Sequence, residues 1–314
     1  MLEGGLLASS GGGTLRLWHA ATGKGAGSMS LDEGRDNSSS IAALPGGRVA
    51  SSASVWHAAT RKLVSRHTGH PGAVLCVAVL PGDRVATGCA DGAVRLWAAA
   101  TGELLHTLQQ HGDRVNALAL LSDGRLAAGS EAVRVWDLSN PTHAVAKLPH
   151  HMQVFALAAL EGGRLASGCN GGKVRLWQAA SSSCFTLEHG SHSVVNALAV
   201  LPRGLLASGG DDNTVRVWGV ADHSCKAVLQ HQEPVHGLAA LPGGLLASCS
   251  AGDGMICVWD LAHLSAGEPH APAADAAGAH RAPKCPTCTL HTLGPLPGPA
   301  SGVFLCFLCR HIIH

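Results

Sequence analysis

The stretch HPGAVLCVAVLPGDRVATGCADGAVRLWAAATGELLHTLQQ, residues 70–110, carries the pattern of four consecutive β-strands. The apolar run VLCVAVL predicts a buried strand, and the Pro-Gly-Asp that follows predicts a turn. RVATG predicts a second strand, and Asp91-Gly92 a tight turn. AVRLW alternates in polarity and predicts a third strand, and ATGELLHTLQ predicts a turn and a more polar fourth strand. The unit is therefore one small antiparallel sheet.

The same unit returns along the chain, and its tryptophan marks the period. The seven tryptophans are Trp18, Trp56, Trp97, Trp136, Trp177, Trp218 and Trp259, with successive gaps of 38, 41, 39, 41, 41 and 41 residues. A period near 40 built from short strands and turns is typical of a propeller blade. We therefore expect an all-β fold, a seven-bladed β-propeller of four-stranded antiparallel blades. Closure of such a ring protects its edge strands.

The spacing of a His, a strand, a turn and the segment SG..DG..VRLW resembles the WD-repeat (WD40) family over roughly residues 4–262. In that family a His, a Ser or Thr, an Asp and the Trp form a hydrogen-bonded chain inside each blade. The matching residues are His70, Thr87, Asp91 and Trp97; His231, Ser248, Asp253 and Trp259; and Ser208, Asp212 and Trp218, with His192 one position out of register. A buried indole N–H needs an acceptor and a buried His needs a fixed tautomer, so we expect structural rather than catalytic roles.

The first blade is incomplete. GGLLASSGGGTLRLW (4–18) corresponds to GGLLASCSAGDGMICVW (243–259), which holds the second and third strands of the last blade. Only Met1, Leu2 and Glu3 precede the first copy, so its innermost strand is missing from the pattern. Three explanations stay open: SGVFLCFL (301–308) returns to supply the strand, the sequence is truncated at its N-terminus, or the ring depends on a partner.

Composition narrows the function classes. The formal charge is +1 and the pI about 7.7, so no electrostatic argument favours nucleic acid or an anionic membrane as the partner. Apolar runs such as AVLCVAVL (73–80) are too short to span a bilayer. The N-terminal residues do not resemble a secretory signal, so we expect a cytoplasmic or nuclear protein that is not secreted.

The C-terminal part differs from the repeats. We expect a propeller over residues 1–262, an Ala/Pro-rich linker over 263–283 and a Cys-rich tail over 284–314. Its four tail cysteines form two CxxC pairs, Cys285 with Cys288 and Cys306 with Cys309, separated by 17 residues. This spacing fits one structural zinc held by four thiolates, and it resembles small zinc ribbons. Two alternatives stay open: a propeller strand, in which Cys306 and Cys309 point to opposite faces, or neither structure.

Signatures of catalysis are scarce in this sequence. A phosphate loop, a GxSxG elbow and an HExxH spacing do not occur. We therefore expect a non-enzymatic scaffold or adaptor that binds other proteins or peptides. The alternatives are a substrate-receptor subunit of a ubiquitin ligase and, from another class, a propeller hydrolase.

The resemblance also implies where partners bind. In the WD-repeat family the partner surface is commonly the face that holds the loops before each innermost strand and the turns ahead of the Asp position. The residues of this chain at those places are Asp113, Arg114, Met152, Gln153, Asn170, Asp211 and Glu233. They differ from blade to blade, as a recognition surface should, and exposed Arg and Met are suitable anchors.

Overall fold

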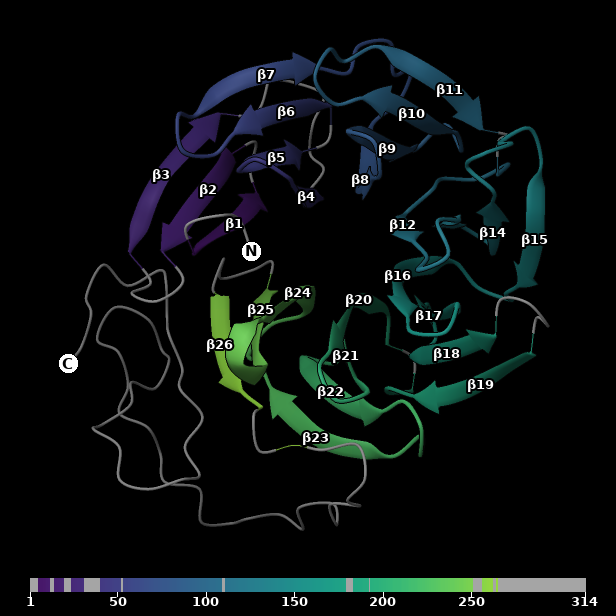
Figure 1. Cartoon of the computed structure of the whole chain (residues 1–314). Helices are drawn as coiled ribbons and strands as arrows, with labels where there is room; N and C mark the ends of the chain where they lie inside the picture. The colour runs from purple at the N-terminus through teal and green to yellow at the C-terminus, as the bar shows by residue number, and fades with distance from the viewer. Residues whose placement is uncertain are drawn as a thin grey trace.

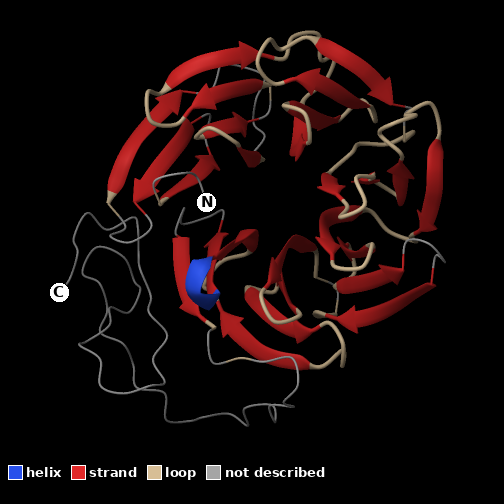
Figure 2. Ribbon diagram, in the orientation of Figure 1, coloured by secondary structure: helices blue, strands red, loops and turns tan. Residues whose placement is uncertain are grey.

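The chain forms a ring of seven small antiparallel sheets around a central axis (Figure 1), which confirms the predicted seven-bladed β-propeller. The computed structural model describes residues 5–11, 14–19, 24–30, 40–51, 53–108, 111–178, 183–191, 193–250, 256–261 and 264. Figure 2 shows that strands dominate this part of the chain. The one helical segment among the described residues is the 3-10 turn η1 (Pro242–Gly244).

The blades follow the chain order. Blades 1 and 2 contain β1 (Leu6–Gly11), β2 (Thr14–His19) and β3 (Gly25–Ser30), then β4 (Ile41–Leu44), β5 (Arg48–Ser51), β6 (Ser54–His57) and β7 (Lys62–Arg66). Blades 3 and 4 contain β8 (Val74–Leu80), β9 (Arg84–Cys89), β10 (Val94–Ala98) and β11 (Leu104–Leu108), then β12 (Ala117–Leu120), β13 (Leu126–Gly129), β14 (Ala132–Trp136) and β15 (Ala144–Pro149).

The remaining blades repeat the same order. Blades 5 and 6 contain β16 (Val154–Leu160), β17 (Arg164–Cys169), β18 (Lys173–Gln178) and β19 (Ser183–Glu188), then β20 (Val195–Leu201), β21 (Leu205–Gly210), β22 (Thr214–Gly219) and β23 (Cys225–Gln230). Blade 7 contains β24 (Val235–Leu241), β25 (Leu245–Ser250) and β26 (Ile256–Asp260). In blades 2 to 7 the first strand of each sheet lines the central channel (Figure 1).

The turn from the first to the second strand uses left-handed backbone. In blade 5 Gly162 and Gly163 have φ values of 70° and 68°, which suits a tight hairpin turn whose twist matches the strands. Asp83, with φ 55°, occupies the same kind of turn in blade 3. Its carboxylate pairs with Arg48 of blade 2 at 2.6 Å, so this turn also links neighbouring blades.

In blades 3 to 6 the next blade approaches so closely that one position in the second strand is glycine. A Cβ on Gly168 would lie 2.5 Å from Cγ1 of Val195, the first residue of the next innermost strand. Gly209 stands in the same relation to Val235, also at 2.5 Å. Each glycine thus receives a valine from the following blade, which sets the spacing of the ring.

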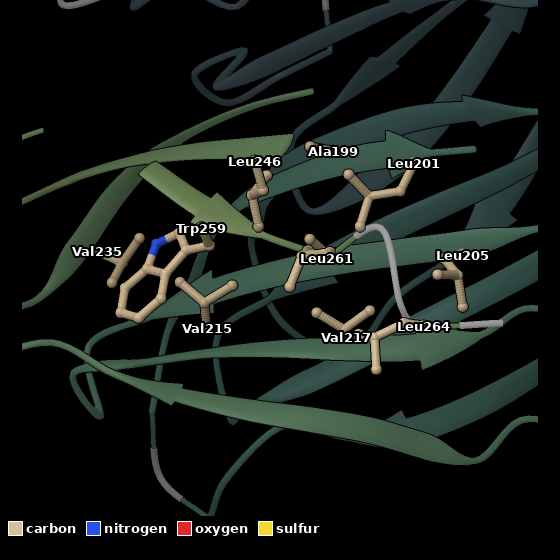
Figure 3. Packing of buried hydrophobic residues seen from close by; sticks show 11 residues of the cluster. Ala199, Leu201, Leu205, Val215, Val217, Val235, Leu246, Trp259, Leu261 and Leu264 are labelled. Carbon is tan, nitrogen blue, oxygen red and sulfur yellow. The ribbon is translucent and has the colours of Figure 1, made fainter. Parts of the chain in front are cut away.

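The apolar core lies between the sheets, from one blade to the next. Figure 3 shows the cluster between blades 6 and 7, where Trp259 of β26 and Leu246 of β25 lie beside Val215 and Val217 of β22. Trp259 is 7% exposed and Leu246 is fully buried. Because the same arrangement recurs around the ring, each blade is stabilised mainly by its two neighbours.

Two sheets have three strands among the described residues. Blade 1 contains only β1–β2–β3, as expected from the missing innermost strand. Blade 7 contains β24–β25–β26 among the described residues, and the segment where the fourth strand was expected lies outside them.

Candidate functional site

Blade 6 contains a complete chain of hydrogen bonds from its tryptophan to an exposed turn. Trp218 Nε1 donates to Ser208 Oγ at 2.7 Å, and Ser208 Oγ lies 2.7 Å from His189 Nδ1. His189 Nε2 lies 3.1 Å from Asp212 Oδ1. Since the carboxylate can only accept, Nε2 carries the proton, and Nδ1 accepts from the serine hydroxyl. In this hydrogen-bond network of blade 6, each buried polar group therefore has a partner.

The histidine of that chain is not the one considered from the sequence. His192 lies outside the described residues, and His189 supplies the contact, nineteen residues before Ser208. In blades 5 and 7 the corresponding spacing is seventeen, and His150 and His231 use Nε2 instead of Nδ1. The different spacing is accommodated because either ring nitrogen can meet the hydroxyl, an exchange that sequence spacing alone does not reveal.

Blades 5 and 7 hold shorter versions of the same chain. In blade 5 Trp177 donates to Ser167 at 2.8 Å, His150 Nε2 lies 2.8 Å from that hydroxyl, and His150 Nδ1 lies 3.2 Å from the Leu148 carbonyl. In blade 7 Ser248 Oγ lies 2.6 Å from Nε1 of Trp259 and 2.6 Å from Nε2 of His231. Asp253 lies outside the described residues.

Blade 3 departs from the expected pattern at two of its four residues. Trp97 Nε1 donates to Thr87 Oγ1 at 2.8 Å, as the spacing predicts. His70 faces a different side chain, because its Nδ1 lies 3.2 Å from Cys89 Sγ. Asp91 forms a 2.6 Å ion pair with Arg95 instead of binding the histidine. In blade 3 Arg95, two residues before Trp97, therefore binds the Asp91 carboxylate.

Blade 4 leaves two buried polar atoms without a partner among the described residues, namely Trp136 Nε1 and His111 Nε2. His111 Nδ1 lies 3.1 Å from Ser130 Oγ. Ala128 pairs with Arg134 in the register that pairs Thr87 with Arg95 in blade 3. The position that holds the hydroxyl in blades 3, 5 and 6 is therefore alanine in blade 4, and its methyl group cannot bond either atom.

The electrostatics of these chains indicate a structural role. Burial lowers the pKa of His70, His111 and His150 to about 4 and also lowers that of His189, so all four are neutral at pH 7. Burial raises the pKa of the Cys89 thiol beside His70, so this Cys–His contact holds no thiolate nucleophile. The described residues also contain no group of three or more His, Cys, Asp or Glu side chains that could hold a metal ion.

The seven residues expected to meet partners lie on or near the face where these chains end. Asp113 and Gln153 belong to consecutive blades, and Gln153 Nε2 donates to Asp113 Oδ2 at 2.6 Å. Arg114 beside them is exposed, and its backbone N–H donates to Asp113 Oδ1 at 2.7 Å. These two hydrogen bonds hold the pKa of Asp113 below its usual range, so the carboxylate stays charged. Met152 is 51% exposed.

The same rim continues over blades 5 and 6. The Asn170 N–H donates to the Gln153 carbonyl at 3.0 Å, and Asn170 also forms a β-bridge with Val194. The Asp211 N–H donates to the Val194 carbonyl at 3.0 Å, and Asn196 Nδ2 donates to Asp211 Oδ1 at 2.6 Å. Six of the seven residues are thus gathered on blades 4 to 6. Glu233 is exposed in the turn that enters β24, beyond this hydrogen-bonded rim.

An apolar pocket lies on the opposite face, between blades 6 and 7. It measures about 340 Å³ and is lined by the β20–β21 turn, the turn before β25, and Leu261 and Leu264. Arg203 is the one charged residue among the described residues that line it, and its guanidinium donates to the Leu264 carbonyl at 3.5 Å. The described part of the lining offers no acid, base or nucleophile for catalysis.

The comparison with protein families agrees with the fold. The WD40 model, described as WD domain, G-beta repeat, matches residues 61–98, 102–137, 181–219 and 223–260. Each match contains the outer strand of one blade and the first three strands of the next. Fold and matches together identify the chain as a WD-repeat β-propeller. Proteins of this class typically bind other proteins and are generally non-catalytic.

The predictions for the C-terminal part concern residues that the structure does not describe. Cys285, Cys288, Cys306 and Cys309, the ligands of the proposed zinc site, lie outside the described residues, as do SGVFLCFL (301–308) and the linker. In the described part of the chain, no helix is long and apolar enough to cross a bilayer.

Proposed function

We propose that this propeller is a non-enzymatic scaffold that binds a partner protein or peptide through the face of blades 4 to 6. The observation that carries the proposal is the hydrogen-bonded rim from Asp113 to Asp211, which presents exposed side chains on loops that are already fixed. Binding to fixed loops avoids the entropic cost of ordering them.

Two exposed residues of the rim are the main candidates for anchors. The Met152 side chain is flexible and polarizable, which suits an irregular apolar partner surface. The Arg114 guanidinium can form paired hydrogen bonds with a partner carboxylate. Asp211 and Asn170 add polar contacts at the edge of the same surface.

The test is quantitative partner capture with the full chain carrying Arg114→Ala and Met152→Ala together. Loss of two central anchors is expected to weaken capture at least about tenfold, which corresponds to about 1.4 kcal/mol. Thermal melts of the variant should match the wild type because both side chains are exposed.

The matched control is Val145→Ala in the outer strand β15. Val145 is 55% exposed, close to the value for Met152, but it lies on the circumference of the ring. Undiminished capture by the rim variant would contradict the proposal. Loss of capture with Val145→Ala instead would move the partner site to the outer strands.

A further inference from the structure

Blades 3 to 6 each carry an arginine two residues before the tryptophan, and in two of these blades the arginine meets an acid of its own turn. In blade 3 Arg95 Nη2 lies 2.6 Å from Asp91 Oδ2. In blade 6 Arg216 Nη2 lies 3.6 Å from Asp212 Oδ2. In both blades the acid stands four residues before the arginine, in the turn between the second and third strands. The guanidinium charge is therefore balanced within the blade.

Blade 5 lacks this acid, because the residue four positions before Arg175 is Gly171. Arg175 Nη1 is buried and has no hydrogen-bond partner among the described residues. Blade 4 has also lost the acid, but there Arg134 Nη1 donates to the His111 carbonyl at 2.9 Å. Of the four arginines, Arg175 is thus the one that has neither a carboxylate nor a carbonyl partner among the described residues.

The other charges near Arg175 do not balance it. Burial, and then the neighbouring Arg175 charge, lower the pKa of His150 to about 4, so this histidine is neutral at pH 7. Lys173, on the same strand, lies 3.8 Å from Glu188, so that acid already has a cation beside it. A half-buried guanidinium without a counter-charge is costly, and an anion is the ligand that removes this cost.

A movable side chain stands beside the residue that replaces the acid. A Cβ on Gly171 would lie 3.1 Å from Sδ of Met152, two residues before Val154. By strand register the equivalent residues are the smaller Gly72 in blade 3 and Ser193 in blade 6. Met152 is 51% exposed and unbranched, so it can turn toward solvent without disturbing the core.

We propose that blade 5 binds a carboxylate of the partner protein, which pairs with the Arg175 guanidinium after the Met152 side chain turns aside. The partner thereby supplies the acid that blades 3 and 6 hold in their own turns. A guanidinium and a carboxylate match in two parallel hydrogen bonds, which makes the contact selective as well as strong. This inference rests on the proposed function, because Met152 belongs to the rim of blades 4 to 6.

The direct test follows the Nε–Hε signal of Arg175 by NMR in the full chain, with Arg175→Lys to assign it. The probe is N-acetyl-aspartate N-methylamide, and the matched control is the neutral N-acetyl-asparagine N-methylamide. We expect a saturable shift with the acidic probe alone, half-saturated at about 1–10 mM as for other ligands with few heavy atoms. The Arg95 signal should not move, because Asp91 already occupies its guanidinium.

Two variants separate this carboxylate site from the wider rim. Met152→Ala should lower the half-saturating probe concentration at least about threefold, because the side chain no longer has to turn aside. The same substitution should weaken capture of a whole partner, which contacts Met152. Arg175→Gln should melt no lower than the wild type, since it removes an unbalanced charge, whereas Arg95→Gln should melt lower because it leaves Asp91 unpaired.

Three results would overturn the inference. The first is an Arg175 signal that shows no saturable shift up to about 50 mM probe, or that shifts equally with the neutral probe. The second is saturable binding at the exposed Arg114 and not at Arg175. The third is saturation by inorganic phosphate at a tenfold lower concentration, which would assign the site to phosphate. The capture experiment with Arg114→Ala and Met152→Ala is independent of all three, so the proposed function can hold even where this inference fails.

Discussion

Replacing Ala128 by serine should stabilise this propeller, although the position is completely buried. The fourth blade leaves Trp136 Nε1 and His111 Nε2 without partners among the described residues. At the same register in blade 6, Ser208 Oγ lies 2.7 Å from both its tryptophan and its histidine. A serine at Ala128 would place a hydroxyl between the two orphaned atoms, accepting from Trp136 and donating to His111.

The magnitude follows from the cost of leaving these atoms unpaired. An unsatisfied buried polar group costs about 1–3 kcal/mol, and the new hydroxyl must itself be desolvated at a comparable cost. Two hydrogen bonds gained against one hydroxyl buried leave about 1–2 kcal/mol of added stability. For a chain of this size this gain corresponds to a rise in Tm of about 2–4 °C.

Urea unfolding followed by tryptophan fluorescence measures the effect, with the slope of the transition checked for constancy. Ala127→Ser is the matched control, because Ala127 is equally buried but lies in the apolar cluster with Val133 and Val135. It should lower the free energy of unfolding by about 1–3 kcal/mol. A neutral or destabilising Ala128→Ser, or an equal gain from Ala127→Ser, would refute the reasoning.

Two further perturbations test the histidines and the glycines. The pKa of His70, His111 and His150 is about 4 in the folded chain and about 6.5 when unfolded, so their stabilisation is complete above pH 6.5 and is lost as pH falls toward 4. Urea melts at pH 7.5 and 5.5 should therefore differ by about 2–4 kcal/mol after allowance for partial exposure, and equal midpoints would contradict this. Gly168→Ala should lower the free energy of unfolding by about 1–3 kcal/mol, because its Cβ would lie 2.5 Å from Val195. The control Gly25→Ala, with nothing within 4 Å of its Cβ, should change it by less than about 0.5 kcal/mol. Equal shifts in the thermal melts of the two variants would contradict this prediction.

The ring could be predicted from the sequence because the repeat is local. Trp97 and Thr87 lie ten residues apart on strands joined by one tight turn, so their contact depends only on hairpin register. The missing innermost strand of blade 1 was also readable, since the start of the chain can be compared with residues 243–259. These features need no knowledge of how one blade meets the next.

The histidine contacts were harder to predict than the ring, because each histidine lies in the loop before its blade and not on the hairpin that holds the Trp. The choice of Nδ1 or Nε2 lets His189 serve at a spacing where seventeen residues would select Ser191. In blade 4 the hairpin is shorter but keeps the pairing of blade 3, so the hydroxyl position is Ala128, eight residues before Trp136 instead of ten. The Asp113–Gln153 hydrogen bond joins two blades and requires the closed ring.

The rim that we propose as the partner surface is supported from within the ring. Blades 5 and 6 contain tryptophan–hydroxyl–histidine hydrogen-bond networks that end in a carbonyl or a carboxylate, and they underlie the rim from Asp113 to Asp211. Because each blade contacts mainly its neighbours, substitutions in blades 1 and 2 should disturb this rim little.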